Sequence, residues 1–119
     1  MNTSVILLGH GSRAETGNTA LAEIAGMLKE MEAGAVIPAY LQFCSPSLTD
    51  AVRQAVAEGA DRIIVVPYFL YSGNHVTQDI PEELDGLRAE YSQVEIIMTE
   101  HLGAHRKLAE IVIERIKKV

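Results

Sequence analysis

The chain has 119 residues, of which 48% are hydrophobic, and its formal net charge at pH 7 is −6. This length suits one domain, which we place at residues 1–119, and the apolar fraction is ample for a single core. The negative charge argues against a nucleic-acid or anionic-membrane partner. Without a long apolar run, a signal sequence or a second cysteine, the chain is expected to be a cytoplasmic protein that binds no membrane.

The hydrophobic pattern alternates between the spacing typical of strands and that of helices. Short apolar runs predict strands at residues 4–8, 36–43, 63–66 and 94–98. Apolar residues at helical spacing predict helices at residues 15–32, from residue 47 to the glycine at 59, at 79–91 and at 104–118.

Local signals refine three of these elements. Pro38 places the second strand at a sheet edge or in a bulge, because proline has no N–H to donate to a ladder. The run at 63–66 is uninterrupted and β-branched, as expected of a central parallel strand covered on both faces. Asp-Ile-Pro-Glu at 79–82 has the form of a capping box with proline in the first turn.

Alternating strands and helices imply parallel strands joined by right-handed crossovers. We therefore predict an α/β fold, a three-layer αβα sandwich around a four-stranded parallel sheet of order 2-1-3-4. Such sheets bind ligands beyond the carboxyl ends of their strands, where the direction of winding changes. His10, after the first strand, and His75, after the third, are then expected to open into one crevice.

Both histidines also have simpler explanations. Residues 9–12 are compatible with a tight strand-to-helix turn in which Ser12 helps to cap the helix. They are also compatible with a phosphate-cradling loop, although the GxGxxG and P-loop patterns are absent. His75 follows Ser-Gly-Asn at 72–74, which is turn chemistry, and is compatible with a polar loop residue.

Other residues near this edge have open roles. His101 and His105 follow the fourth strand, where helix capping or exposure is the simplest role and a rim contact is the alternative. Tyr68 and Tyr71 could stack on a flat ligand or shelter the loop. Cys44 is expected to be a small buried side chain rather than a nucleophile.

Two motifs carry a family resemblance. The chain reads Leu-Leu-Gly-His-Gly-Ser-Arg at 7–13 and Val-Pro-Tyr-Phe-Leu-Tyr-Ser-Gly-Asn-His-Val-Thr-Gln-Asp-Ile-Pro at 66–81. These motifs resemble those of the class II tetrapyrrole chelatases, and more narrowly the short, single-domain sirohydrochlorin chelatases of the CbiX type. The resemblance extends to Ser-Pro-Ser-Leu at 45–48 and Leu-Gly at 102–103, so it covers nearly the whole chain.

The resemblance implies a chelatase-like fold and the insertion of a divalent metal into sirohydrochlorin without ATP. Cobalt is the expected metal substrate, and iron and nickel are the alternatives. By position, His10 and His75 match the two histidines with which the family binds the metal and accepts pyrrole protons. Neutral imidazole suits Co²⁺, Fe²⁺ and Ni²⁺, and its ordinary pKa of about 6.5 lets it accept a proton at neutral pH.

Other motif residues are candidate contacts for the polycarboxylate substrate. N–H groups of the Ser12 turn, the Arg13 guanidinium and helix N-termini all suit carboxylates. For Arg13 a surface ion pair is the alternative. The complete set of candidate substrate-binding residues is Gly11, Ser12, Arg13, Gln42, Tyr71, Ser72, Gly73 and Asn74.

The second strand departs from the family pattern near its end. Family members commonly carry a glutamate where this chain has Gln42, and an acidic residue is also frequent at the position of Ser45. Glutamine can orient a ligand or water, but it carries no charge and takes no proton. The resemblance therefore does not supply a third, acidic metal ligand.

The chain contains one set of motifs, whereas longer family members contain two such units. One small unit encloses a large, flat macrocycle poorly, so we expect a homodimer whose sheets face a shared cleft with their carboxyl edges, as the short forms of the family suggest. Two other classes of function stay open. The first is a metal or tetrapyrrole carrier without catalysis, and the second is a flavodoxin-like phosphate- or nucleotide-binding module that uses residues 9–13.

Overall fold

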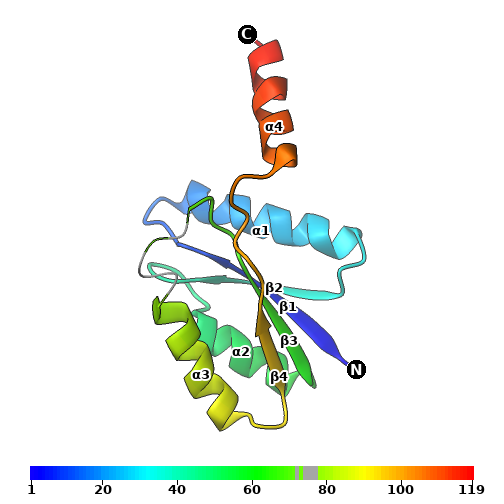
Figure 1. Cartoon of the computed structure of the whole chain (residues 1–119), viewed down its shortest axis with the longest axis vertical. Coiled ribbons are helices and arrows are strands. Elements are labelled where there is room, and N and C mark those ends of the chain that lie inside the picture. Colours follow the sequence, from blue (N-terminus) through cyan, green and yellow to red (C-terminus); the bar gives the residue numbers. More distant parts are fainter. Residues whose placement is uncertain (72, 74–77) are drawn as a thin grey trace.

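The computed structural model describes residues 1–71, 73 and 78–119. Strands and helices alternate along this part of the chain (Figure 1). The strands are β1 (Thr3–Gly9), β2 (Ala35–Tyr40), β3 (Arg62–Pro67) and β4 (Glu95–Met98). The helices are α1 (Glu15–Glu30), α2 (Leu48–Ala57), α3 (Ile80–Glu90) and α4 (Arg106–Lys117). Within the described ranges, no helix has the length and apolarity needed to cross a membrane.

The four strands form one parallel sheet in the order β2-β1-β3-β4, which confirms the predicted topology. β1 pairs with β2 on one side and with β3 on the other, so it lies inside the sheet. Pro38 is in β2, an edge strand, opposite Leu7 of β1. The edge position predicted for this proline is therefore confirmed. On the open side of an edge strand there is no neighbouring strand, so a residue without an N–H costs the sheet no hydrogen bond there.

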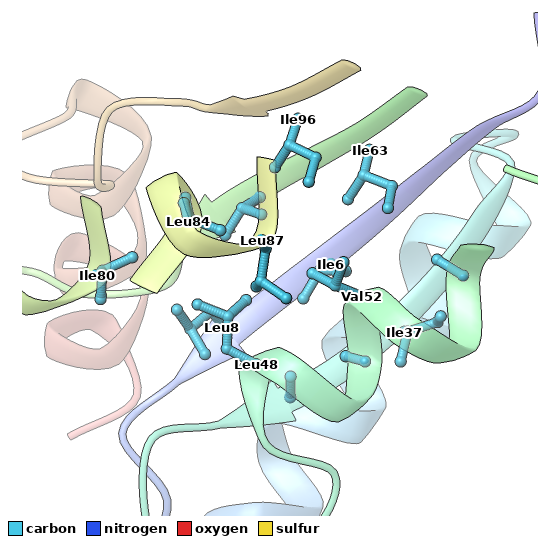
Figure 2. Packing of buried hydrophobic residues seen from close by; sticks show 14 of the residues in the cluster. Ile6, Leu8, Ile37, Leu48, Val52, Ile63, Ile80, Leu84, Leu87 and Ile96 are labelled. Atoms are coloured by element: carbon cyan, nitrogen blue, oxygen red, sulfur yellow. The ribbon is translucent and has the colours of Figure 1, made fainter. Parts of the chain in front are cut away.

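Helices cover the sheet on both faces, and the predicted three-layer architecture is confirmed. α2 and α3 pack on one face, where Leu48 and Val52 of α2 and Leu84 of α3 meet Ile6 and Ile63 of the strands (Figure 2). α1 packs on the other face through its own smaller cluster. Burial of these apolar side chains is the main term that holds the layers together.

β3 differs from the prediction that both of its faces are covered. Ile63, Val65 and Pro67 are buried, but Arg62, Ile64 and Val66, which alternate with them, remain partly exposed. The reason is the position of the helices: α2 and α3 cover the first face, whereas α1 packs against β1 and β2. α4 stands apart from the sheet at one end of the molecule (Figure 1) and has no buried residue.

The ends of three elements test the local signals. The predicted start of a helix at Ser47 is confirmed, since α2 begins at Leu48 and the Ser47 Oγ caps it by accepting the Asp50 N–H at 3.2 Å. The predicted capping box is wrong, because Asp79 already has helical angles (φ −68°, ψ −42°) and its side chain makes no capping hydrogen bond. β2 ends at Tyr40 rather than at residue 43, and Phe43 takes a positive φ of 68°, which a strand does not allow.

Ile6→Ala is expected to lower the free energy of unfolding by about 2–5 kcal/mol, because Ile6 is 0% exposed at the centre of the larger cluster. Met27→Ala is the control on α1, where the side chain is 51% exposed. This control should change the free energy by no more than about 0.5 kcal/mol. Urea denaturation followed by circular dichroism measures both, and equal effects would contradict the assigned core.

Candidate active site at the carboxyl edge of the sheet

Backbone hydrogen bonds continue past the ends of the strands and join the loops there. The Tyr68 N–H donates to the Leu8 carbonyl at 2.7 Å, which ties the segment after β3 to the end of β1. The Gln42 N–H donates to the His10 carbonyl at 3.1 Å, which ties the loop after β2 to the loop after β1. The loop after β1 is therefore held between its two neighbours.

His10 is the first residue after β1 and is exposed at this edge. Its imidazole packs against the ring of Phe69, with the ring centroids 4.1 Å apart and the planes tilted by 46°. Phe69 is 3% exposed and belongs to the larger core cluster. The core thus fixes the side of the imidazole that faces Phe69, while the residue as a whole remains open to a ligand.

Asn18, in the second turn of α1, holds the loop that carries His10. Its Oδ1 accepts the Ser12 N–H at 2.9 Å, and its Nδ2 donates to the Ser12 carbonyl at 2.8 Å. The Tyr40 hydroxyl donates to the Asn18 carbonyl at 3.2 Å. We did not identify Asn18 from the sequence. The available signal was an asparagine in a helical stretch, since this side chain often bonds to nearby backbone.

Burial raises the pKa of Tyr40, and the nearby Cys44 raises it further. The phenol therefore stays protonated well above neutral pH and remains a donor to Asn18. Cys44 is half-buried and packs against the smaller core cluster, on the face of the sheet that carries α1. Its Sγ lies 3.7 Å from the Ser12 carbonyl oxygen. Cys44 is thus less buried than we predicted, although it packs against the core.

Gly11 meets two demands that only glycine satisfies. Its φ of +85° lies in the left-handed region, which side chains disfavour. A Cβ at this position would also collide with the Gln42 carbonyl oxygen. The structure thus gives Gly11 a conformational role: it lets the loops after β1 and β2 approach each other closely.

A cavity of about 190 Å³ opens beside His10, between the loop after β1, the start of α1 and Tyr68. Small-molecule sites usually have volumes of about 300–1,000 Å³. The cavity can therefore accept part of a ligand, such as a carboxylate arm, but not a whole macrocycle. Tyr68 lines this cavity and is half-buried, so it both shelters the loop and faces the space.

Apolar side chains lie exposed around this edge. The Arg13 guanidinium carbon is 4.8 Å from the centre of the Phe43 ring, a cation–π contact rather than the surface ion pair that we considered. Phe43 is 54% exposed, and Leu70 and Tyr71, which follow β3, are 52% and 82% exposed. A flat ligand could lie against such rings.

The structure brings one part of the predicted site together and leaves another part open. The loop at residues 10–13 and Gln42 meet at the carboxyl edge, and Gly73 is exposed. The other predicted residues, His75, Ser72 and Asn74, lie outside the described residues.

The described part of the chain contains no group of three histidine, cysteine or acidic side chains that could hold a metal ion. His105, a candidate for helix capping, has this role, since its Nδ1 accepts the Lys107 N–H at 3.0 Å at the start of α4.

Asn18→Ala is expected to lower the free energy of unfolding by about 1–3 kcal/mol, because it leaves the Ser12 N–H and carbonyl without their partner. Asn18→Asp keeps the acceptor but loses the donor, and a carboxylate oxygen then faces the Ser12 carbonyl. We expect it to destabilise at least as much as alanine. Thermal unfolding measures both, and a fully stable Asn18→Asp would contradict the proposed pair of bonds.

Comparison with known proteins identifies the family. A model of the CbiX family matches residues 4–119. The chain is 35% identical to the sirohydrochlorin cobaltochelatase of Methanopyrus kandleri, over 97% of this chain and 95% of that protein. It is also 35% identical to the chloroplastic sirohydrochlorin ferrochelatase of Arabidopsis thaliana, over 95% of this chain and 51% of that protein.

A solved structure agrees with these relatives. The crystal structure of the sirohydrochlorin chelatase SirB from Bacillus subtilis subspecies spizizenii, in complex with cobalt, has a TM-score of 0.92 at 25% identity. The match covers 100% of this chain and 51% of that chain. This chain therefore spans about half the length of the plant and Bacillus proteins and nearly all of the archaeal one. Because the family model matches almost every residue, the chain belongs to the CbiX family.

Proposed function

We propose that this protein is a sirohydrochlorin chelatase, which inserts a divalent metal ion into the tetrapyrrole without ATP. The observation that carries the proposal is the exposed His10 imidazole, held at the carboxyl edge by Phe69 and by its loop. The relatives matched over nearly the whole chain are named cobaltochelatases and ferrochelatases. Cobalt is the proposed metal, with iron and nickel as alternatives, because imidazole suits all three.

The reaction replaces two pyrrole N–H protons with one divalent ion. In our proposal His10 and His75 hold the metal, because neutral imidazole binds such ions through a ring nitrogen. The same residues accept the two pyrrole protons and pass them to solvent. A site with few protein ligands suits transfer of the metal ion to the macrocycle, since the ion must leave the protein for four pyrrole nitrogens. No cluster of three ligating side chains competes for the ion among the described residues.

The residues around His10 support binding of a polycarboxylate macrocycle. Arg13 would bind a carboxylate arm, while Phe43 and Tyr71 would contact the flat ring. Ser12 has a narrower role than we expected from the sequence, because its N–H already donates to Asn18. Its hydroxyl group can still donate its proton to a carboxylate. Gly73 and the residues at 72 and 74 stay proposed contacts on the strength of the motif at 66–81. Gln42 stays one because its backbone is bonded to that of His10.

The phosphate-binding alternative finds little support in the loop. Cradling an anion requires several free backbone N–H groups. The Ser12 N–H donates to Asn18, and the Ala14 N–H donates to the Ser12 hydroxyl oxygen at 3.0 Å. The carrier alternative is favoured by Gln42, which replaces an acidic residue, and the rate of metal insertion separates it from the chelatase.

We also propose that the protein is a homodimer with a shared cleft. The cavity beside His10, about 190 Å³ in volume, is too small for a macrocycle. A second copy that faces the carboxyl edge would enclose the substrate from the other side.

Sirohydrochlorin incubated with Co²⁺, Fe²⁺ or Ni²⁺ and followed by its absorption spectrum tests the reaction. We expect faster insertion with the protein than without it, for at least one metal. His10→Ala and His75→Ala should each lower the rate by about 100-fold or more, which is typical for loss of an acid–base group. His105→Asn, which keeps a helix-capping side chain, is the control and should keep the rate. If the protein accelerates insertion of none of the metals, only the carrier function remains. Equal rates in all variants would reject the roles assigned to the two histidines.

Gln42→Glu tests the departure at the second strand. The backbone of residue 42 is bonded to that of His10, so a carboxylate here would lie near a bound metal. We expect Co²⁺ to bind roughly tenfold more tightly, because a nearby negative charge favours a divalent ion. Gln42→Met is the uncharged control. Isothermal titration with Co²⁺ alone measures the change, and equal affinities for the two variants would show that position 42 does not face the metal.

A further inference from the structure

Phe43, in the turn that follows β2, has two unfavourable features. Its φ of +68° lies in the left-handed region, which a bulky side chain disfavours and glycine tolerates best. The residue is also 54% exposed and belongs to neither core cluster, so the core gains little from its ring. Residues with such backbone angles persist where the surrounding structure holds them, and they are concentrated at functional sites. An ordinary surface turn therefore gives no reason for phenylalanine at this position.

The backbone next to Phe43 is fixed by the loop after β1. The Gln42 N–H donates to the His10 carbonyl at 3.1 Å. A Cβ on Gly11 would collide with the Gln42 carbonyl oxygen, so the two loops are in close contact. These contacts hold the turn, and with it the ring of Phe43, beside the loop at residues 10–13.

The backbone on both sides of Arg13 is fixed as well. The N–H and the carbonyl of Ser12 are bonded to the Asn18 side chain, and the Ala14 N–H donates to the Ser12 hydroxyl oxygen. The Arg13 guanidinium carbon lies 4.8 Å from the centre of the Phe43 ring. Within the described part of the chain, no ion pair engages Arg13. The ring thus restricts the guanidinium, while no carboxylate of that part neutralises its charge.

We propose that Phe43 is a positioning residue for Arg13, and that its ring holds the guanidinium ready for a carboxylate arm of the tetrapyrrole. A guanidinium that contacts a ring through its face keeps its N–H donors free, because these lie in the plane of the group. Arginine loses rotamer freedom when it binds a ligand, and a side chain that is already restricted loses less. The inference rests on the proposed function, because that function supplies the carboxylates.

The position of the pair suits an arm at the periphery of the macrocycle. Arg13 lies three residues beyond His10 in the same loop, and Phe43 follows the residue whose N–H bonds to the His10 carbonyl. A carboxylate bound by this guanidinium therefore fixes how the macrocycle lies relative to the imidazole. The face of the Phe43 ring that Arg13 does not contact stays available to the macrocycle, so positioning adds to the direct contact proposed above.

A double-mutant cycle separates positioning of Arg13 from direct contact with the macrocycle. Phe43→Leu removes the ring but keeps an apolar side chain that is also disfavoured at positive φ. We expect it to weaken binding of metal-free sirohydrochlorin by about two- to fivefold more in the unchanged background than in Arg13→Gln, as expected for an exposed cation–π contact. Phe43→Tyr keeps the ring, and it should bind as the unchanged protein does. Titration followed by the absorption spectrum measures binding, and an equal effect of Phe43→Leu in both backgrounds would overturn the proposal.

The kinetics of Co²⁺ insertion give a second readout. The contact between Arg13 and a carboxylate arm is made before the metal enters and is kept afterwards. Phe43→Leu should therefore raise KM for sirohydrochlorin and leave kcat unchanged. A lower kcat at unchanged KM would show that residue 43 acts on the reacting centre, and it would overturn the positioning role.

An NMR measurement without ligand keeps this role separate from the chelatase function. The ring current of Phe43 should shift the δ-methylene protons of Arg13 to higher field, and Phe43→Leu should return them to their ordinary position. Ordinary positions in the unchanged protein would overturn the positioning role even where sirohydrochlorin binds. Shifted signals in a protein that binds no sirohydrochlorin would instead overturn the proposed function, and with it the role of this pair in holding a tetrapyrrole arm.

Discussion

The central position of β1 is the constraint on which the candidate site depends. β1 is paired on both sides, so the chain must leave it at the carboxyl edge, between the loops that follow β2 and β3. His10 is the first residue beyond that strand. Gly11 allows the two loops to meet, and Asn18 fixes the turn from inside α1. The position of His10 therefore follows from sheet pairing, one glycine and one amide, and the ring of Phe69 orients its imidazole.

The fold could be predicted because each strand and helix has a local signal in the sequence. Alternating periodicity gives parallel strands, and Pro38 gives an edge strand, so only a few strand orders remain. The cover of β3 could not be predicted in this way. A β-branched run shows that a strand avoids water, but it does not show whether helices cover both of its faces. Ile64 is the residue at which this difference appears.

The candidate site was predicted only in part, for related reasons. His10 and Arg13 belong to a motif, and a motif can be read without coordinates. Asn18 acts through two hydrogen bonds to Ser12, six positions back in the chain, and helical periodicity gives no sign of such bonds. Arg13 contacts Phe43, and Phe43 has a positive φ where we had expected a strand, so the sequence did not indicate this contact. The small cavity beside His10, which holds only part of a macrocycle, is the observation behind the proposed homodimer.

The central claim is that His10 and His75 hold the metal substrate, and the chain offers its own controls because it has only four histidines. The most direct measurement is an NMR titration of the histidine ring signals with Co²⁺ in the absence of tetrapyrrole. The account predicts that the signals of His10 and His75 shift or broaden first, while those of His101 and His105 respond later and less. Early changes at His101 and His105, with His10 and His75 unaffected, would contradict it.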